Sequence, residues 1–205
     1  VISTLKQNYP DAKIDVLLYQ DTIPILSENP EINALYGISN KGVKTTDKIK
    51  NALSLIKTLR ANQYDLVVNL TDQWMVAVIV RCLSARVKIS QLYGHRQHGF
   101  WKNSFTQLAP IHGTHIVERN LSVLEPLGIT DFYQDTTMSY APEHWQKIHK
   151  NLDTLGIKGR YVVIQPTARQ QFKCWDNDKF SRVIDALHRR GYKVILTSGP
   201  SADDL

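Results

Sequence analysis

Three side chains able to hold an anion lie within seven residues of one another: Thr167, Arg169 and Lys173. The apolar run at residues 161–164 before them is typical of a buried strand, and an amphipathic helix is expected over residues 176–190. Where a strand of a parallel sheet leads through a loop into a helix, free N–H groups and the helix dipole attract negative charge. Hydroxyl and cationic side chains at such a corner suit a phosphate or diphosphate. The alternative is a solvated basic loop that happens to precede a helix.

A second group of polar and cationic side chains interrupts the regular pattern between residues 93 and 113. This stretch is rich in Gly, His, aromatic and basic residues, and it includes Arg96, His98 and Lys102. It is long for a connection inside a compact domain, and long connections are often functional. A surface loop with buried aromatic residues is the alternative. No carboxylate or Cys completes a ligand set around its histidines at a known spacing, so we expect no metal site.

A third group stands at the start of the helix expected over residues 115–127, which Gly128 closes. His115, Glu118 and Arg119 are one to four residues apart, so their side chains can share one helix face. A lone Glu–Arg pair on a helix is usually an exposed ion pair of little consequence. Spacing alone therefore gives this group no function.

The segments that must position these groups alternate between strand-like and helix-like patterns. This alternation, with short connections, predicts an α/β fold with mostly parallel, doubly wound sheets. The stretch over residues 129–141 is irregular and is expected to cross into a second domain. We therefore expect an N-terminal domain over residues 1–138 and the start of a second domain over residues 139–205. Strands are expected at residues 13–19, 34–36, 65–70, 87–90, 161–164 and 192–197.

The composition of the chain limits the classes of binding partner that we expect. Lys and Arg outnumber Asp and Glu by 25 to 19, a formal net charge of +6. A basic chain favours phosphorylated substrates, an anionic membrane surface or nucleic acid. Nucleic acid ranks last, because the basic residues are scattered and match no binding motif. Neither a P-loop nor a GxGxxG motif is present, which disfavours a P-loop NTPase or a dehydrogenase.

The remaining sequence features concern the cellular compartment of the protein and the ends of the chain. Cys82 and Cys174 are far apart and predict neither a disulfide framework nor a metal site, which suits a reducing compartment. No apolar run is long enough to span a bilayer, and we expect no signal peptide. The chain begins at Val1 inside a helical pattern and stops at Leu205, where another helix is expected to begin, so we expect a part of a longer protein.

The anion-binding stretch PTARQQFKCWDNDKF resembles the second-domain loop of the lipopolysaccharide core heptosyltransferases, glycosyltransferase family 9. The shared pattern is a strand, hydroxyl residues, a cation, then Lys-x-Trp and a helix. The family usually has Pro after the Trp, where this chain has Asp176. The segments DLVVNLTDQW and HIVERNLSVLEPLG also resemble the family, so the likeness covers nearly the whole chain. It is strongest to the heptosyltransferase III branch, which adds the side-branch heptose of the inner core.

The resemblance implies a GT-B architecture of two Rossmann-like domains and inverting transfer of heptose from ADP-heptose to a hydroxyl of the lipopolysaccharide inner core, without a metal or other cofactor. Lys173 would neutralise the departing diphosphate, assisted by Thr167 and Arg169. His115 and Arg119 match residues that face the acceptor. From composition alone, Arg96, His98 and Lys102 are further candidates for contact with anionic core sugars. The implied location is the cytoplasmic face of the inner membrane, held by peripheral contact with anionic lipid.

Two departures limit this expectation. The family's catalytic base is an Asp in a Gly-Asp pair expected just upstream of Val1, so no residue of this chain is expected to be the base. The family binds the nucleotide with an acidic residue after a Gly that matches Gly199, whereas Pro200 and Ser201 follow here. Two alternatives stay open: a GT-B enzyme with another nucleotide sugar, and a non-catalytic binding protein that keeps the fold.

Overall fold

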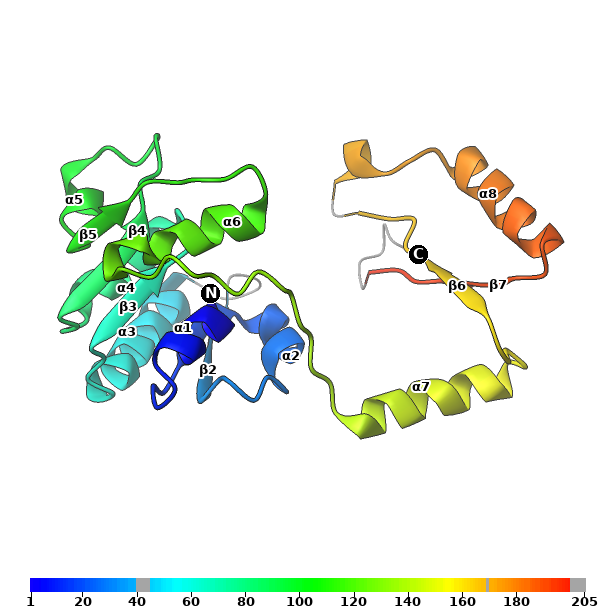
Figure 1. The fold of residues 1–205 in the computed structure, drawn as a ribbon, viewed down its shortest axis with the longest axis horizontal. Coiled ribbons are helices and arrows are strands. Elements are labelled where there is room, and N and C mark those ends of the chain that lie inside the picture. The colour runs from blue at the N-terminus through cyan, green and yellow to red at the C-terminus, as the bar shows by residue number, and fades with distance from the viewer. Residues whose placement is uncertain (40–44, 169, 200–205) are drawn as a thin grey trace. The chain divides into compact units, whose positions relative to one another are not determined.

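The computed structural model describes residues 1–39, 45–168 and 170–199 of the chain (Figure 1). The chain divides into two compact units, Val1–Tyr140 and Ala141–Leu205. We refer to them as unit 1 and unit 2. Every strand pair in the described part is parallel, which confirms the predicted α/β class.

Unit 1 contains two parallel sheets. Strand β1 (Asp15–Tyr19) pairs with β2 (Ala34–Ile38), and β3 (Leu66–Asn69), β4 (Val87–Gln91) and β5 (Gln107–Ala109) form a three-stranded sheet in that order. The expectation that residues 93–113 form only a connection is wrong in part, because β5 lies within them and pairs with β4. The three residues of β5 are too few to show a strand period, so the pairing becomes visible only in three dimensions.

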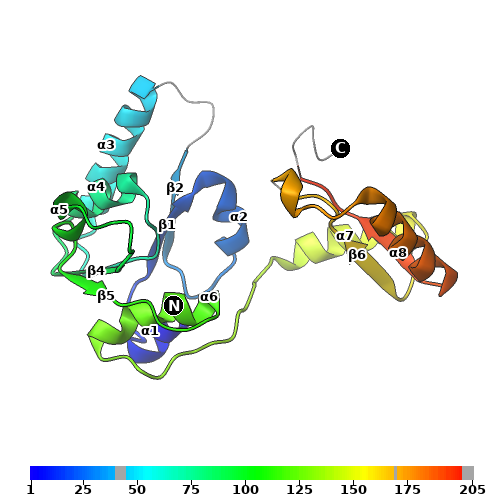
Figure 2. The ribbon, with the colours of Figure 1, turned by 90° about the horizontal axis from the view of Figure 1, so that it is seen from above.

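The helices of unit 1 cover both faces of the β3–β4–β5 sheet (Figure 2). Side chains alternate along a strand: Leu66 and Val68 of β3 pack into a core with Leu121 and Leu124, whereas Val67 packs on the other side with Ala77 and Trp101. The helices of this unit are α1 (Ile2–Asn8), α2 (Ile23–Leu26), α3 (Thr45–Ala61), α4 (Trp74–Cys82), α5 (Gly99–Lys102) and α6 (Ile116–Leu121), with 3-10 turns η1 (Gln20–Thr22) and η2 (Ser122–Leu127).

The helix expected over residues 115–127 is shorter than predicted. It is α-helical only to Leu121 and continues as the 3-10 segment η2, which holds Pro126. A proline inside a helix removes a hydrogen-bond donor and clashes with the preceding turn, which explains the change of helix type. Gly128 ends the segment with a left-handed backbone, φ +77°, as its position predicted.

A polar network ties together the amino ends of β1 and β3. The Tyr64 hydroxyl donates to Asp15 Oδ2 at 2.7 Å, and Asn62 Nδ2 donates to the hydroxyls of Tyr64 and Tyr36 at 2.8 and 2.9 Å. Burial raises the pKa of Tyr64, so the phenol keeps its proton and stays a donor. This network holds the edge of the strands opposite to the one that carries the candidate site.

Unit 2 is a smaller parallel β-α-β arrangement. Helix α7 (Pro142–Thr154) leads to β6 (Tyr161–Ile164), which is followed by the 3-10 turn η3 (Gln171–Lys173), helix α8 (Asn177–Arg189) and β7 (Lys193–Leu196). β6 and β7 are paired in register from Tyr161 and Lys193 onward. No helix in the described ranges of either unit is long and apolar enough to cross a membrane.

Candidate functional site

The carboxyl ends of β3, β4 and β5 lie at one edge of the sheet in unit 1, because all three strands are parallel. The buried amide of Asn69 marks this edge: its Nδ2 donates to Ser90 Oγ at 2.9 Å and to the Thr71 carbonyl at 2.7 Å. These bonds fix the start of the loop after β3 against the end of β4. The loops after β3, β4 and β5 therefore leave the sheet side by side.

Asp72, in the loop after β3, holds the loop after β4. Its carboxylate Oδ2 lies 2.8 Å from His95 Nε2 and 3.9 Å from Arg96 Nη2, and its carbonyl accepts from Arg96 Nε at 2.8 Å. A polar residue just before a helix often caps it. In the structure α4 begins at Trp74 without a side-chain cap, and Asp72 instead positions the cation.

Arg96 lies in an aromatic cluster rather than in open solvent. Its guanidinium carbon is 5.0 Å from the ring centre of Trp74 and 5.6 Å from that of Trp101, within the range of cation–π attraction. His98 is edge-on to Trp74, with 6.3 Å between ring centroids. Burial raises the pKa of the neighbouring Tyr93 to about 12, so that phenol is protonated at neutral pH. The structure thus brings Arg96 and His98 together around Trp74, a residue that the sequence did not single out.

His115 and Glu118 form a capping box at the start of α6. His115 Nδ1 accepts from the Val117 N–H at 3.3 Å, and Glu118 Oε2 accepts from the N–H groups of Thr114 and His115 at 2.9 and 3.1 Å. This geometry places the proton of a neutral His115 imidazole on Nε2. Backbone hydrogen bonds from His115 and Thr114 lower the pKa of Glu118. Glu118 is therefore a structural residue, and in the described part of the chain no ion pair joins it to Arg119.

Replacement of Glu118 by Ala is expected to lower the thermal midpoint of unit 1 at pH 7 by a few degrees, since two backbone N–H groups lose their acceptor. The lowered pKa means that the stabilisation is present above the ordinary Glu value and is lost as the pH falls through the folded-state pKa. Thermal scans from pH 7 to pH 3 should therefore show the wild-type and Ala midpoints converging. Glu118→Gln keeps an acceptor without the charge and should be stable at pH 7. A midpoint difference that is constant down to pH 3 would contradict this assignment.

His115 and Arg119 are both exposed and lie four residues apart at the start of α6, so they share a face of the helix. The buried amide of Gln91, at the end of β4, donates through Nε2 to the Arg119 carbonyl and so fixes α6 to the sheet. Within the described ranges no hydrogen bond or ion pair joins these side chains to Arg96. They form a second polar surface, with the Arg119 guanidinium as its cation, at the same sheet edge.

The anion-binding corner predicted in unit 2 lies at the carboxyl ends of β6 and β7. Gln165 Nε2 donates to Thr167 Oγ1 at 2.9 Å, and the Thr197 hydroxyl donates to Gln165 Oε1 at 2.6 Å. Gln165 and Thr197 thus hold Thr167. Both follow carboxyl strand ends, where ligands bind, but their contact depends on the pairing of β6 with β7. Gly199 follows Thr197 by two residues, whereas Arg169 lies outside the described residues.

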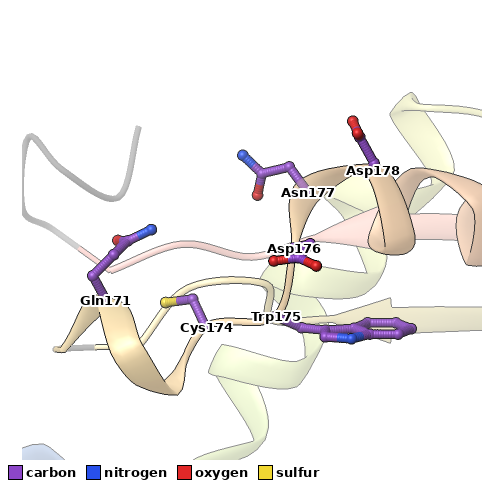
Figure 3. Close-up of a pocket in the computed structure, with 6 residues that line it drawn as sticks. All are labelled: Gln171, Cys174, Trp175, Asp176, Asn177 and Asp178. Atoms are coloured by element: carbon purple, nitrogen blue, oxygen red, sulfur yellow. The ribbon is translucent and has the colours of Figure 1, made fainter.

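The loop of this corner is closed by Cys174, whose Sγ accepts from the Ala168 N–H at 3.2 Å. Beside it lies an open hollow of about 540 Å³ (Figure 3). The Nζ atom of Lys173 lies 5.7 Å from the Phe172 ring centre, and both side chains are exposed. The hollow is lined by Gln171, Cys174, Trp175, Asp176, Asn177 and Asp178.

Two carboxylates stand at the first turn of α8, where the sequence predicted an attractive site for anions. Asp176 is paired with Lys179 at 2.7 Å, and Asp178 lies in the first helical turn. Figure 3 shows Gln171 and Cys174 near each other, with the Trp175 indole directed away from them. An anion bound here meets negative charge from the helix side, so the cation of Lys173 carries more of the attraction than a bare helix N-terminus would require.

Comparison with known proteins identifies the family of the chain. The family model described as glycosyltransferase family 9 (heptosyltransferase) matches residues 52–205. The chain belongs to glycosyltransferase family 9. It is 83% identical over all 205 residues to lipopolysaccharide heptosyltransferase 3 of Escherichia coli K12, and 69% identical over the same length to another E. coli protein of that name. The chain spans 60% of the length of each of these relatives.

Solved structures share the fold of this family 9 chain. A family 9 glycosyltransferase from Veillonella parvula superimposes with a TM-score of 0.84 over 97% of the chain and 57% of its own, at 19% identity. E. coli ADP-heptose heptosyltransferase II gives 0.71 over 99% of the chain and 60% of its own, at 18% identity. These neighbours confirm the predicted GT-B class. The roles of the individual site residues stay predictions.

Proposed function

We propose that this family 9 chain is the part of an inverting heptosyltransferase that contains the acceptor site and the anion-binding corner for the diphosphate of the donor. The enzyme would transfer heptose from ADP-heptose to a hydroxyl of the lipopolysaccharide inner core. The observation that carries this proposal is the 83% identity, over the whole chain, to a protein named lipopolysaccharide heptosyltransferase 3. The polar corner at Thr167 and Lys173 supports it, because a nucleotide-sugar donor has a diphosphate leaving group.

In the proposed reaction an acceptor hydroxyl attacks the anomeric carbon of the heptose. A new C–O bond forms as the bond to the diphosphate oxygen breaks, and the electron pair leaves with ADP. Lys173 offers fixed positive charge where this negative charge develops, and Thr167 offers a hydroxyl donor. Arg169 is proposed to assist, and Gly199 to lie beside the nucleotide. The proton of the attacking hydroxyl goes to the Asp of the Gly-Asp pair expected upstream of Val1.

The acceptor is proposed to bind at the carboxyl edge of unit 1. His115 and Arg119 offer an imidazole N–H and a guanidinium from one helix face, and Arg96 and His98 surround the exposed indole of Trp74. Charged and aromatic groups of this kind suit a sugar that carries phosphate or carboxylate. The proposed location is the cytoplasmic face of the inner membrane, where such a lipid-linked acceptor is presented.

The deciding experiment uses the full-length protein and titration calorimetry. ADP and ADP-heptose should bind, whereas UDP and UDP-sugars should bind at least tenfold more weakly. Product analysis on inner-core acceptors that lack the branch heptose should then show one added heptose with inverted configuration. Tighter binding of UDP-sugars would favour a GT-B enzyme with another donor, and binding without transfer would favour a non-catalytic protein. The proposal routes no step through a metal, so transfer should persist in excess EDTA.

A further inference from the structure

We propose that the exposed face formed by α4 and α5 docks on an anionic lipid surface. This inference rests on the proposed function, because a lipid-linked acceptor brings the enzyme to a membrane. It adds a specific surface, which we call the α4–α5 face: the side chains of Trp74, Val78, Arg81, Phe100 and Lys102. The two helices lie side by side, and Arg81 Nη1 on α4 donates to the Asn103 carbonyl just after α5 at 3.2 Å (Figure 2).

The apolar part of this face is aromatic and continuous. Trp74, Val78 and Phe100 are exposed by 42%, 44% and 38%, although each is a large apolar side chain. Trp74 and Val78 are four residues apart on α4, so they share one face of the helix. The Trp74 and Phe100 rings are 6.0 Å apart between centroids. Half-exposed aromatic rings with a polar side are the residues that occupy the interface between lipid and water.

Cations surround these apolar groups. Arg81, seven residues after Trp74 on the same side of α4, lies 5.4 Å from the Phe100 ring centre, and Lys102 on α5 is exposed. Residues 72–107 contain five Lys or Arg side chains and one carboxylate. That carboxylate, Asp72, is already held by His95 and Arg96. The face therefore presents unbalanced positive charge next to aromatic surface, which is complementary to anionic headgroups above an apolar layer.

The position of the face agrees with a lipid-linked acceptor. Trp74 belongs both to this face and to the aromatic cluster around Arg96 at the carboxyl edge of the sheet. A bilayer in contact with α4 and α5 would present the sugar of its lipid directly to the candidate acceptor loops. A nucleic acid would also be attracted by the cations, but it would not require Val78, which has no group for a phosphate or a base edge.

The test is flotation of the full-length protein with vesicles of phosphatidylcholine alone, or with 30% phosphatidylglycerol. The wild type should float with the anionic vesicles and should be released by high salt. Each cation near an anionic surface contributes roughly a fivefold change in partitioning, so Arg81→Gln with Lys102→Gln should weaken it roughly 25-fold. Val78→Asp, at an exposed position that leaves the core intact, should abolish flotation. The matched controls are on α7 of unit 2: Lys147→Gln with Lys150→Gln, and Ile148→Asp, which should float like the wild type.

The inference is overturned if the α4–α5 variants float like the wild type, or if only the α7 variants lose flotation. It is also overturned if short duplex DNA binds the protein as tightly as the vesicles do and Val78→Asp leaves that binding unchanged. Transfer to a deacylated, water-soluble acceptor separates this inference from the proposed function. Val78→Asp should keep that activity while it loses transfer to acceptor embedded in anionic vesicles. Loss of wild-type transfer in both assays would contradict the proposed function instead.

Discussion

Replacement of Lys173 by Ala is expected to lower kcat/KM for heptose transfer from ADP-heptose by about 10²–10³-fold, the effect of removing one preorganised group that faces developing charge. The effect should be large here because Lys173 is the one cation among the described residues of the loop between β6 and α8, 165–168 and 170–176. The first turn of α8 carries Asp176 and Asp178 beside the hollow, so a diphosphate bound there is opposed from the helix side. Lys173 lies in the turn just before them and is exposed to an incoming ligand.

The matched control is Lys158→Ala. Lys158 is also an exposed lysine of unit 2, but it precedes β6 and so lies near the amino end of the strand, away from the corner. Its replacement should change kcat/KM less than about twofold. Calorimetry with ADP separates ground-state binding from stabilisation of the transition state. Weaker ADP binding by Lys173→Ala indicates contact in the ground state. An unchanged affinity with a lower kcat indicates contact in the transition state only. If affinity and kcat are both unchanged, Lys173 does not hold the diphosphate.

The fold was largely predictable because its strands are short apolar runs between clear helical patterns. Residues 66–69 and 161–164 are apolar or nearly so, the pattern expected of strands in a sheet covered on both faces, although Val163 of β6 is 54% exposed in the structure. β5 was missed because Gln107–Ala109 has too few residues for a periodic signal and gains its hydrogen bonds from β4. The pairing of strands, rather than the local sequence, decides such an element.

Whether the contacts of a site residue could be predicted depended on how close in sequence its partners are. Glu118 was weighed as a partner of Arg119, although His115-x-x-Glu118 before an apolar run has the spacing of a capping box. The capping-box spacing was visible in the sequence, and it is a stronger indication of the role of Glu118 than its adjacency to Arg119. The surroundings of Arg96 had no local signal. Its partners Asp72 and Trp74 are more than twenty residues away and meet it only because β3 and β4 pair in one register.

The diphosphate corner shows the same division. Thr167 and Lys173 were found because a hydroxyl and a cation follow a strand and precede a helix. Gln165 and Thr197 were not identified from the sequence, because they are 32 residues apart and their hydrogen bond joins the ends of two different strands. Residues that carry charge can thus be named from the sequence, whereas those that orient them depend on the sheet.

Trp101→Ala is the second substitution with a large expected effect, and it should lower the free energy of unfolding of unit 1 by about 3–5 kcal/mol, the usual cost of removing a buried aromatic side chain. Trp101 is 1% exposed and packs with Ala77, Val80 and Phe105 in one core cluster. A domain is stable by only about 5–15 kcal/mol, so the variant should be close to unfolding at 37 °C. Urea denaturation, followed by hydrogen exchange of β3 and β4, measures the change.

A comparison with Trp101→Phe separates packing from polarity. Trp101 Nε1 is buried and has no hydrogen-bond partner among the described residues, so its removal leaves no acceptor unpaired. Phe keeps an aromatic ring and should cost much less, about 1–2 kcal/mol, for the smaller volume. Trp145→Ala, at a half-exposed position on α7, serves as the control and should cost less than about 1 kcal/mol.

The same pair of variants also tests whether this core positions the acceptor site. The Arg96 guanidinium lies over the rings of both Trp101 and Trp74, so Trp101→Ala removes one of its two aromatic supports. Measured at a temperature where the variant is folded, the KM for acceptor should rise while the KM for ADP-heptose stays constant, and Trp101→Phe should restore the acceptor KM. Equal changes in both KM values would show a general distortion of the active site rather than an effect on the acceptor site alone. An unchanged acceptor KM in folded Trp101→Ala would show that Asp72 and Trp74 are sufficient to hold Arg96.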